Sequence, residues 1–151
     1  MEPDQHERTA AVRDAAFRFR AALERGGLGL PILARFPKGS CGAASQLLGQ
    51  YLTDSGLGHW WYCQGLQCDS LAAHGWLEQD GLTLDITADQ FPEIAEPVLL
   101  TTTPAWHHAN FIMSGGGHVA SVDWYKSCDM FTEVARDYRV LKRRADEERE
   151  R

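Results

Sequence analysis

The stretch His74-Gly-Trp-Leu-Glu-Gln-Asp-Gly-Leu-Thr-Leu-Asp85-Ile-Thr87 predicts a β-hairpin, because Asp80-Gly81 is a favoured two-residue turn. With this turn, Gln79 faces Leu82, Leu77 faces Leu84, Trp76 faces Asp85 and His74 faces Thr87. Alternation then places His74 and Asp85 on one side of the hairpin as diagonal neighbours. We therefore expect Asp85 to accept the Nδ1 proton of His74, which leaves the other ring nitrogen free.

A cysteine stands upstream of the hairpin, where a glycine-bearing turn enters a predicted helix, in Phe36-Pro-Lys-Gly-Ser-Cys41-Gly-Ala-Ala-Ser45. The apolar spacing predicts this helix over about residues 41–53, with Ser40 as its N-cap. A helix N-terminus and a nearby imidazole both lower the pKa of a thiol. Gly42 lets a substrate carbonyl approach the backbone, and the amides of Cys41 and Gly42 are candidate oxyanion donors. Taken alone, Cys41 also fits a small buried residue at a helix start.

The whole chain predicts an α+β fold with an antiparallel sheet, because helices flank a series of strands. We expect helices over 4–25 and 129–147, strands over 59–68, 71–78, 82–87 and 98–102, a connector over 28–38, and strand with loop over 104–124. The length of 151 residues fits one domain, 1–151. It opens with a helical segment, 1–27, and ends in a charged helical tail, 140–151.

Composition narrows the classes of function. The net charge is −6 at pH 7 and the sequence pI is about 5.4, which argues against a nucleic-acid partner. No stretch approaches the ~20 apolar residues of a membrane helix, and the polar N-terminus lacks the apolar segment of a secretory signal. We therefore expect a cytoplasmic protein with no membrane partner. The four cysteines are irregularly spaced, which argues against a disulfide framework.

The set formed by Cys41, His74-x-Trp76-x-Glu78 and Asp85-x-Thr87 resembles the transglutaminase-like core of the papain-like cysteine enzymes. The resemblance covers residues 36–91. It implies a cysteine-bearing helix packed on an antiparallel sheet, a Cys41–His74–Asp85 triad and no cofactor. Members of the family include crosslinkers, peptidases, amidases, deamidases and acyltransferases, so the resemblance selects no single reaction. The sequence departs from many members in lacking a tryptophan beside Cys41, and it shows no calcium loop of the kind that large crosslinkers use.

Other side chains near the motifs are candidates for smaller roles. Gln90 follows the Asp85 strand and is a candidate oxyanion or substrate contact, although a surface turn is the simpler interpretation. Trp76 and Trp106 are candidate cleft residues, with core burial favoured for Trp76. His107 and His108 are adjacent, so on a strand they would point to opposite faces, and a solvated loop is the simpler interpretation.

Metal and phosphate sites are not indicated by the spacing. Cys63 and Cys68 are wider apart than the cysteines of a zinc motif, and no second motif follows them, so we predict no metal site. The run Gly115-Gly-Gly-His118 lacks the strand–loop–helix context and the following Lys-Ser/Thr of a phosphate loop.

These observations predict a thiol-dependent acyl-transfer enzyme that hydrolyses an amide or peptide bond of a protein, a peptide or a small amide. In this scheme Cys41 attacks the carbonyl, His74 carries the proton and Asp85 orients His74. Two alternatives stay open: transfer of the acyl group to an amine, and a binding module that keeps the fold without the chemistry.

Overall fold

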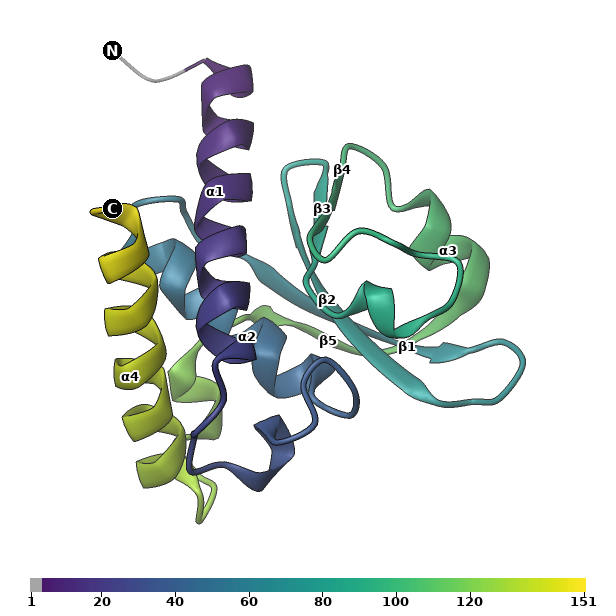
Figure 1. Cartoon of the computed structure of the whole chain (residues 1–151). Helices are drawn as coiled ribbons and strands as arrows, with labels where there is room; N and C mark the ends of the chain where they lie inside the picture. The colour runs from purple at the N-terminus through teal and green to yellow at the C-terminus, as the bar shows by residue number, and fades with distance from the viewer. Residues whose placement is uncertain (1–3) are drawn as a thin grey trace.

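The computed structural model describes residues 4–151 and shows the expected α+β fold (Figure 1). The helices within these residues are α1 (Gln5–Glu24), α2 (Cys41–Asp54), α3 (Ala105–Asn110) and α4 (Phe131–Arg149), with short 3-10 turns η1 (Pro31–Leu33), η2 (Ala88–Gln90) and η3 (Val122–Tyr125). The strands are β1 (Trp61–Gln67), β2 (Ala73–Gln79), β3 (Leu82–Asp85), β4 (Leu99–Thr101) and β5 (Phe111–Val119). They form one antiparallel sheet in the order β4-β3-β2-β1-β5.

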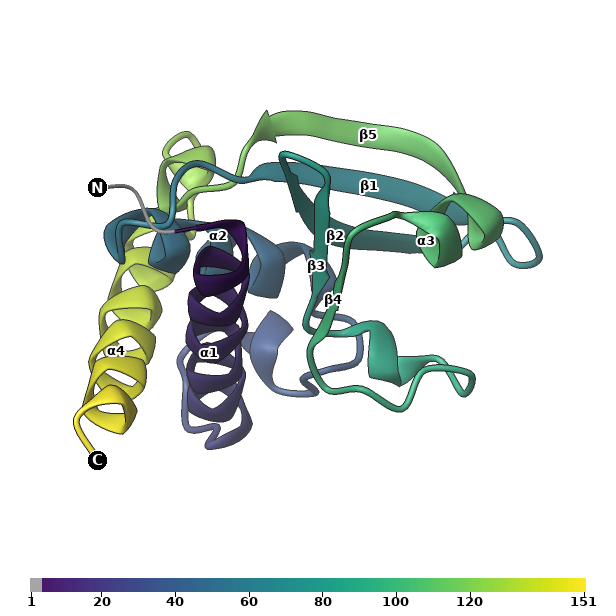
Figure 2. The same ribbon diagram turned by 90° about the horizontal axis from the view of Figure 1, so that it is seen from above.

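Helices α1, α2 and α4 lie together on one side of the sheet, as Figure 2 shows. The main hydrophobic core joins them to the sheet through buried residues such as Phe19 of α1, Leu47 and Tyr51 of α2, Leu77 of β2 and Leu141 of α4. The rings of Phe19 and Tyr51 stack with their centroids 5.2 Å apart. Because α2 packs directly on β2, the fold holds the start of this helix against the strand that carries His74.

The hairpin forms in the predicted register. Leu77 pairs with Leu84, and Gln79 pairs with Leu82. Asp80 and Gly81 have φ values of 44° and 83°, so both turn residues are left-handed. A two-residue turn of this kind needs positive φ at both positions, which Gly tolerates freely and Asp better than most residues.

A second, smaller core covers the opposite face of β2. Side chains alternate along a strand, so Trp76 points away from the helices while its neighbour Leu77 points toward them. Trp76 clusters with Cys63 and Phe111, and Phe91 and Trp106 pack against this group. The start of β2 therefore has an aromatic wall on one face and helix α2 on the other.

The region over 104–124 differs from the strand-and-loop prediction, because it begins with helix α3. The glycine run that follows lies inside β5, where the pairing with β1 shifts register twice. Gly116 has a φ of 82°, and a Cβ on it would lie 2.4 Å from the carbonyl oxygen of Tyr62. The run therefore allows β5 to approach β1 closely around a bulge.

The two flanking helices follow the prediction closely. Helix α1 ends before Gly26 and Gly27, both with positive φ, and α4 continues through the charged tail to Arg149. Leu141 and Ala145 of that tail are fully buried.

The four cysteines, all within residues 4–151, form no disulfide. In the same part of the chain, none of the helices has the length and apolar character to cross a membrane.

Candidate active site

Cys41 is the first residue of α2 and is partly exposed. Gly39, with a φ of 66°, makes the turn before the helix. Ser40 occupies the N-cap position, but its side chain makes no capping hydrogen bond, contrary to the prediction. The first amides of α2 are thus left without a side-chain cap, and the positive end of the helix dipole faces Cys41.

His74 and Asp85 meet on neighbouring strands, as the hairpin register predicts. The Nε2 atom of His74 lies 2.7 Å from Oδ2 of Asp85, and both side chains are buried. The other carboxylate oxygen, Oδ1, accepts from the amide of Thr87 at 2.9 Å and from its hydroxyl at 3.3 Å. The predicted ring nitrogen was wrong: Asp85 binds Nε2 of His74, which leaves Nδ1 free of the carboxylate and 3.5 Å from Nε2 of Gln90. Which ring nitrogen meets Asp85 depends on the orientation of the imidazole about its side-chain bonds, and strand pairing alone does not fix that orientation.

A second imidazole completes the network around Asp85. Nε2 of His107 also lies 2.7 Å from Oδ2 of Asp85, and the side chain of His107 is buried. His107 belongs to α3 and not to a strand or a solvated loop, which corrects the sequence prediction. Because a carboxylate can only accept, both histidines donate through Nε2–H. A neutral His74 therefore keeps Nδ1 unprotonated, ready to take a proton from Cys41.

The charges in this network act on one another. Burial alone would raise the pKa of the Asp85 carboxyl, but hydrogen bonds from His107 and His74 hold that pKa well below its usual range. Burial also opposes protonation of His74, yet its hydrogen bonds to Asp85 and Cys41 raise the pKa of His74 to about 9. Burial, the largest single influence, raises the pKa of the Cys41 thiol, but the hydrogen bond and charge of His74 together with a backbone hydrogen bond from Gly75 lower this pKa overall. The arrangement therefore favours a thiolate beside an imidazolium.

The smaller predicted roles divide into two groups. Gln90 lies at the site, with its Nε2 atom 3.5 Å from Nδ1 of His74 and 3.0 Å from the carbonyl oxygen of Thr87. Trp106 lies half-buried near His74, with ring centroids 6.5 Å apart.

Trp76 was a wrong candidate for substrate contact, because it is fully buried and its indole N–H donates to Glu78 at 3.1 Å. Gly42 follows Cys41 directly, and a Cβ on it would lie 3.3 Å from the hydroxyl of Tyr62, a residue that the sequence did not indicate.

The remaining predicted histidines lie apart from Asp85. His108 is exposed and reaches Glu78 at 4.0 Å. His118 stacks on Trp124 with ring centroids 3.6 Å apart, and its Nε2 atom lies 2.7 Å from Nε2 of Gln46. Both of these side chains have their partners outside the Asp85 network, since His108 pairs with Glu78 and His118 with Gln46 and Trp124.

His74, Asp85 and His107 are also a group of potential metal ligands that no spacing motif indicated. Their donor atoms are paired at 2.7 Å, the length of charge-assisted hydrogen bonds. Ligands bound to one tetrahedral zinc ion at about 2.0–2.2 Å would stand roughly 3.3 Å apart. The three side chains therefore fit a hydrogen-bond network better than a metal centre.

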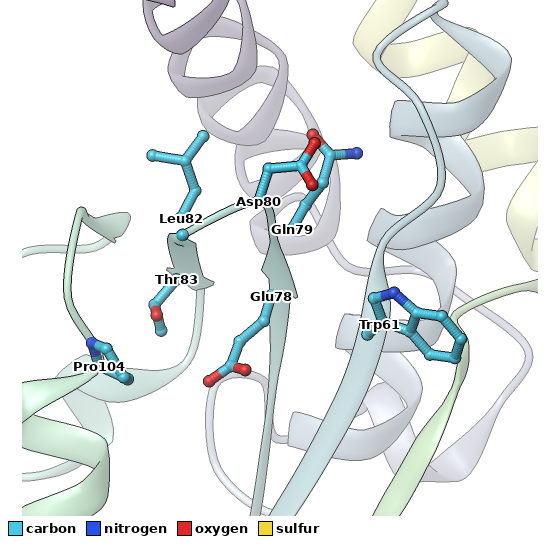
Figure 3. A pocket seen from close by; sticks show the side chains of 8 residues that line it. Trp61, Glu78, Gln79, Asp80, Leu82, Thr83 and Pro104 are labelled. Atoms are coloured by element: carbon cyan, nitrogen blue, oxygen red, sulfur yellow. The ribbon is translucent and has the colours of Figure 1, made fainter.

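A hollow of about 260 Å³ lies at the turn end of the hairpin, lined by residues that include Trp61, Glu78, Asp80 and Pro104 (Figure 3). Cys41, His74 and Asp85 are not among its lining residues. His74 lies at the opposite end of β2, so this hollow is separate from the candidate active site.

No protein-family model matches the chain, and no curated protein or solved structure is detectably similar to it. The roles proposed below therefore rest on the residues and their geometry.

Proposed function

We propose that this protein is a thiol-dependent acyl-transfer enzyme that hydrolyses an amide or peptide bond. The observation that carries the proposal is the 2.7 Å hydrogen bond between Asp85 and His74, which lies on a strand against which α2, the helix that begins at Cys41, is packed. The lowered pKa of the Cys41 thiol, to which His74 contributes, supports it. Nucleophilic acyl transfer requires a nucleophile, a base and a carboxylate that orients the base, and Cys41, His74 and Asp85 are proposed for these three roles. The resemblance of these residues to a transglutaminase-like core supports the same class of chemistry.

The reaction begins when the Cys41 thiolate adds to the substrate carbonyl, with the thiol proton held by His74 at Nδ1. The carbonyl electron pair moves to oxygen, and the resulting oxyanion collapses to expel the amine, which takes the proton from His74. The product is a thioester on Cys41. Water then attacks the thioester, gives one proton to His74 and releases the acid, and that proton returns to the sulfur. Asp85 keeps His74 oriented and stabilises its charged form.

An acylation experiment tests the proposal. Wild-type protein is mixed with p-nitrophenyl acetate, release of p-nitrophenolate is followed, and the acetylated residue is mapped by peptide mass spectrometry. We expect rapid acetylation of Cys41, and loss of this activity in Cys41→Ala and His74→Ala. The matched control is Cys128→Ala, because Cys128 is an exposed cysteine outside the network. The proposal fails if Cys41 is not acetylated faster than Cys128, or if Cys41→Ala reacts like the wild type.

The same thioester on Cys41 can be used to test whether water or an amine accepts the acyl group. Adding a primary amine to the acylated protein distinguishes release by water from transfer to the amine. We expect the acid as the main product at moderate amine concentration, whereas exclusive formation of the amide would indicate a transferase.

A further inference from the structure

Tyr62 is a buried residue of β1 that faces α2, and two glycines make room for it. Its hydroxyl oxygen lies 3.3 Å from the place where a Cβ would stand on Gly42, the residue directly after Cys41. A Cβ on Gly75 would lie 2.5 Å from the same hydroxyl and 2.6 Å from a ring carbon. Tyr62 is only 6% exposed. The phenol is therefore fixed against the first turn of the helix that carries the nucleophile.

The hydroxyl is a proton donor in the resting protein. It donates to Oε1 of Gln64 at 3.0 Å. Burial raises the pKa of Tyr62 far above its usual range, and the negative charge of Cys41 adds to the shift. Tyr62 therefore keeps its proton at neutral pH. A phenol has one proton, so a stronger acceptor that arrives beside Gly42 can take this hydrogen bond from the neutral amide of Gln64.

Addition of a thiolate to a carbonyl creates such an acceptor. The oxyanion forms next to Cys41 and needs donors that are already in place. The amide of Ala44 begins the hydrogen-bonded ladder of α2 by donating to the carbonyl of Ser40 at 2.8 Å. The amides of Cys41 and Gly42 precede that ladder, so they have no partner within the helix, and the Tyr62 hydroxyl lies beside Gly42.

We propose that Tyr62 is a further catalytic residue, whose hydroxyl donates a hydrogen bond to the oxyanion that forms when Cys41 adds to the substrate carbonyl. This inference rests on the proposed function. The phenol transfers no proton: the S–C bond forms, the carbonyl electron pair moves to oxygen, and Tyr62 stabilises the charge together with the backbone amides until the leaving group departs.

The substitution Tyr62→Phe tests the proposal, because it removes only the hydroxyl. Two reactions of Cys41 are compared: acetylation by p-nitrophenyl acetate, which passes through an oxyanion, and alkylation by iodoacetamide, which displaces iodide at a methylene carbon and forms none. We expect acetylation to slow by about 100-fold and alkylation to stay within twofold of the wild-type rate. A purely structural role would slow both reactions together.

The matched control is Gln64→Met, which removes the resting acceptor but not the donor. We expect this variant to acetylate within threefold of the wild-type rate. The proposal is overturned if Tyr62→Phe acetylates at the wild-type rate, if both reactions slow equally, or if Gln64→Met loses acetylation while Tyr62→Phe keeps it. If the wild type is not acetylated on Cys41, the proposed function fails and this inference fails with it. Normal acetylation of both wild type and Tyr62→Phe rejects the role of Tyr62 alone.

Discussion

Asp85 is the residue on which the candidate site depends most. One of its oxygens accepts from two imidazoles and the other accepts from Thr87, while the side chain is completely excluded from solvent. A buried carboxylate is costly unless each lone pair meets a donor. The network therefore lets a negative charge persist behind His74, where it stabilises the imidazolium that the proposed chemistry needs.

Removal of His107 should destabilise the protein in a pH-dependent way. We expect His107→Leu to lower the free energy of unfolding at pH 7 by about 2 kcal/mol, since a buried charged acceptor loses a hydrogen bond. The hydrogen-bonded Asp85 has a pKa below its unfolded value, so its contribution is complete above about pH 4 and is lost as the pH falls further. The difference between wild type and variant should therefore narrow between pH 4 and pH 2, as measured by urea denaturation.

The variant His107→Gln serves as the comparison, because its amide keeps an N–H donor. We expect it to lose less stability than His107→Leu. Equal losses in the two variants, or a loss that does not change with pH, would show that packing and not the hydrogen bond to Asp85 explains the effect.

At the scale of helices and strands, the sequence predicted those features that a few neighbouring residues determine by themselves. The turn at Asp80-Gly81 sets the register of the hairpin by its own backbone geometry, and the glycines at 26 and 27 end α1 in the same way. Helix α3 is too short for a periodic apolar pattern to reveal it. The contact of His107 with Asp85 depends on where α3 packs, so adjacency to His108 gave no signal for it. The place of Tyr62 beside Gly42 was equally hidden, although Gly42 and Gly75 are the residues that make room for it.

The docking of α2 depends on Gly49. A Cβ there would lie 2.3 Å from the Cβ of Ala120 and 3.1 Å from its carbonyl oxygen, so the helix approaches the segment after β5 through a missing side chain. Alanine is the better helix former by about 1 kcal/mol. We nevertheless expect Gly49→Ala to lower the free energy of unfolding by about 1–3 kcal/mol, because both close contacts belong to the backbone or to a methyl group on it.

Urea denaturation of Gly49→Ala and Gly115→Ala provides the check. Gly115 is the matched control, since a Cβ on it would meet only the side chain of Gln64 at 3.7 Å or beyond. We expect Gly115→Ala to stay within about 0.5 kcal/mol of the wild type. A Gly49→Ala protein that is more stable than the wild type would mean that helix propensity decides at this position and that the contact with Ala120 relaxes at little cost.

At the scale of the whole molecule, α1 holds the segment that follows β3. The guanidinium of Arg20 is nearly buried and donates to the carbonyl oxygens of Ile86 and Pro97, each at 2.8 Å, and to Asp89 at 2.7 Å. This segment carries Gln90 next to His74. Residues from the start of the chain thus stabilise one wall of the candidate active site.

We expect Arg20→Met to lower the free energy of unfolding by about 3 kcal/mol, because Asp89 and two carbonyl groups lose their donor together. Arg20→Lys should recover only part of the loss, since an ammonium cannot span the same partners as a planar guanidinium. Arg13→Met, an exposed substitution on the same helix, is the control. The check is the midpoint of urea denaturation. If Arg20→Met and Arg13→Met have the same midpoint, this account of how α1 stabilises the site is contradicted.

The most direct test of the central claim is the rate of Cys41 alkylation by iodoacetamide as a function of pH, measured by peptide mass spectrometry. The structure predicts a midpoint below that of an ordinary thiol in the wild type, because His74 lowers the pKa of Cys41 against the effect of burial. In His74→Ala most of what opposes burial is lost and only the backbone hydrogen bond from Gly75 remains, so the midpoint should rise toward that measured for the exposed Cys128. A wild-type midpoint equal to that of Cys128, or one that does not move in His74→Ala, would contradict the claim that sulfur, imidazole and carboxylate act as a unit.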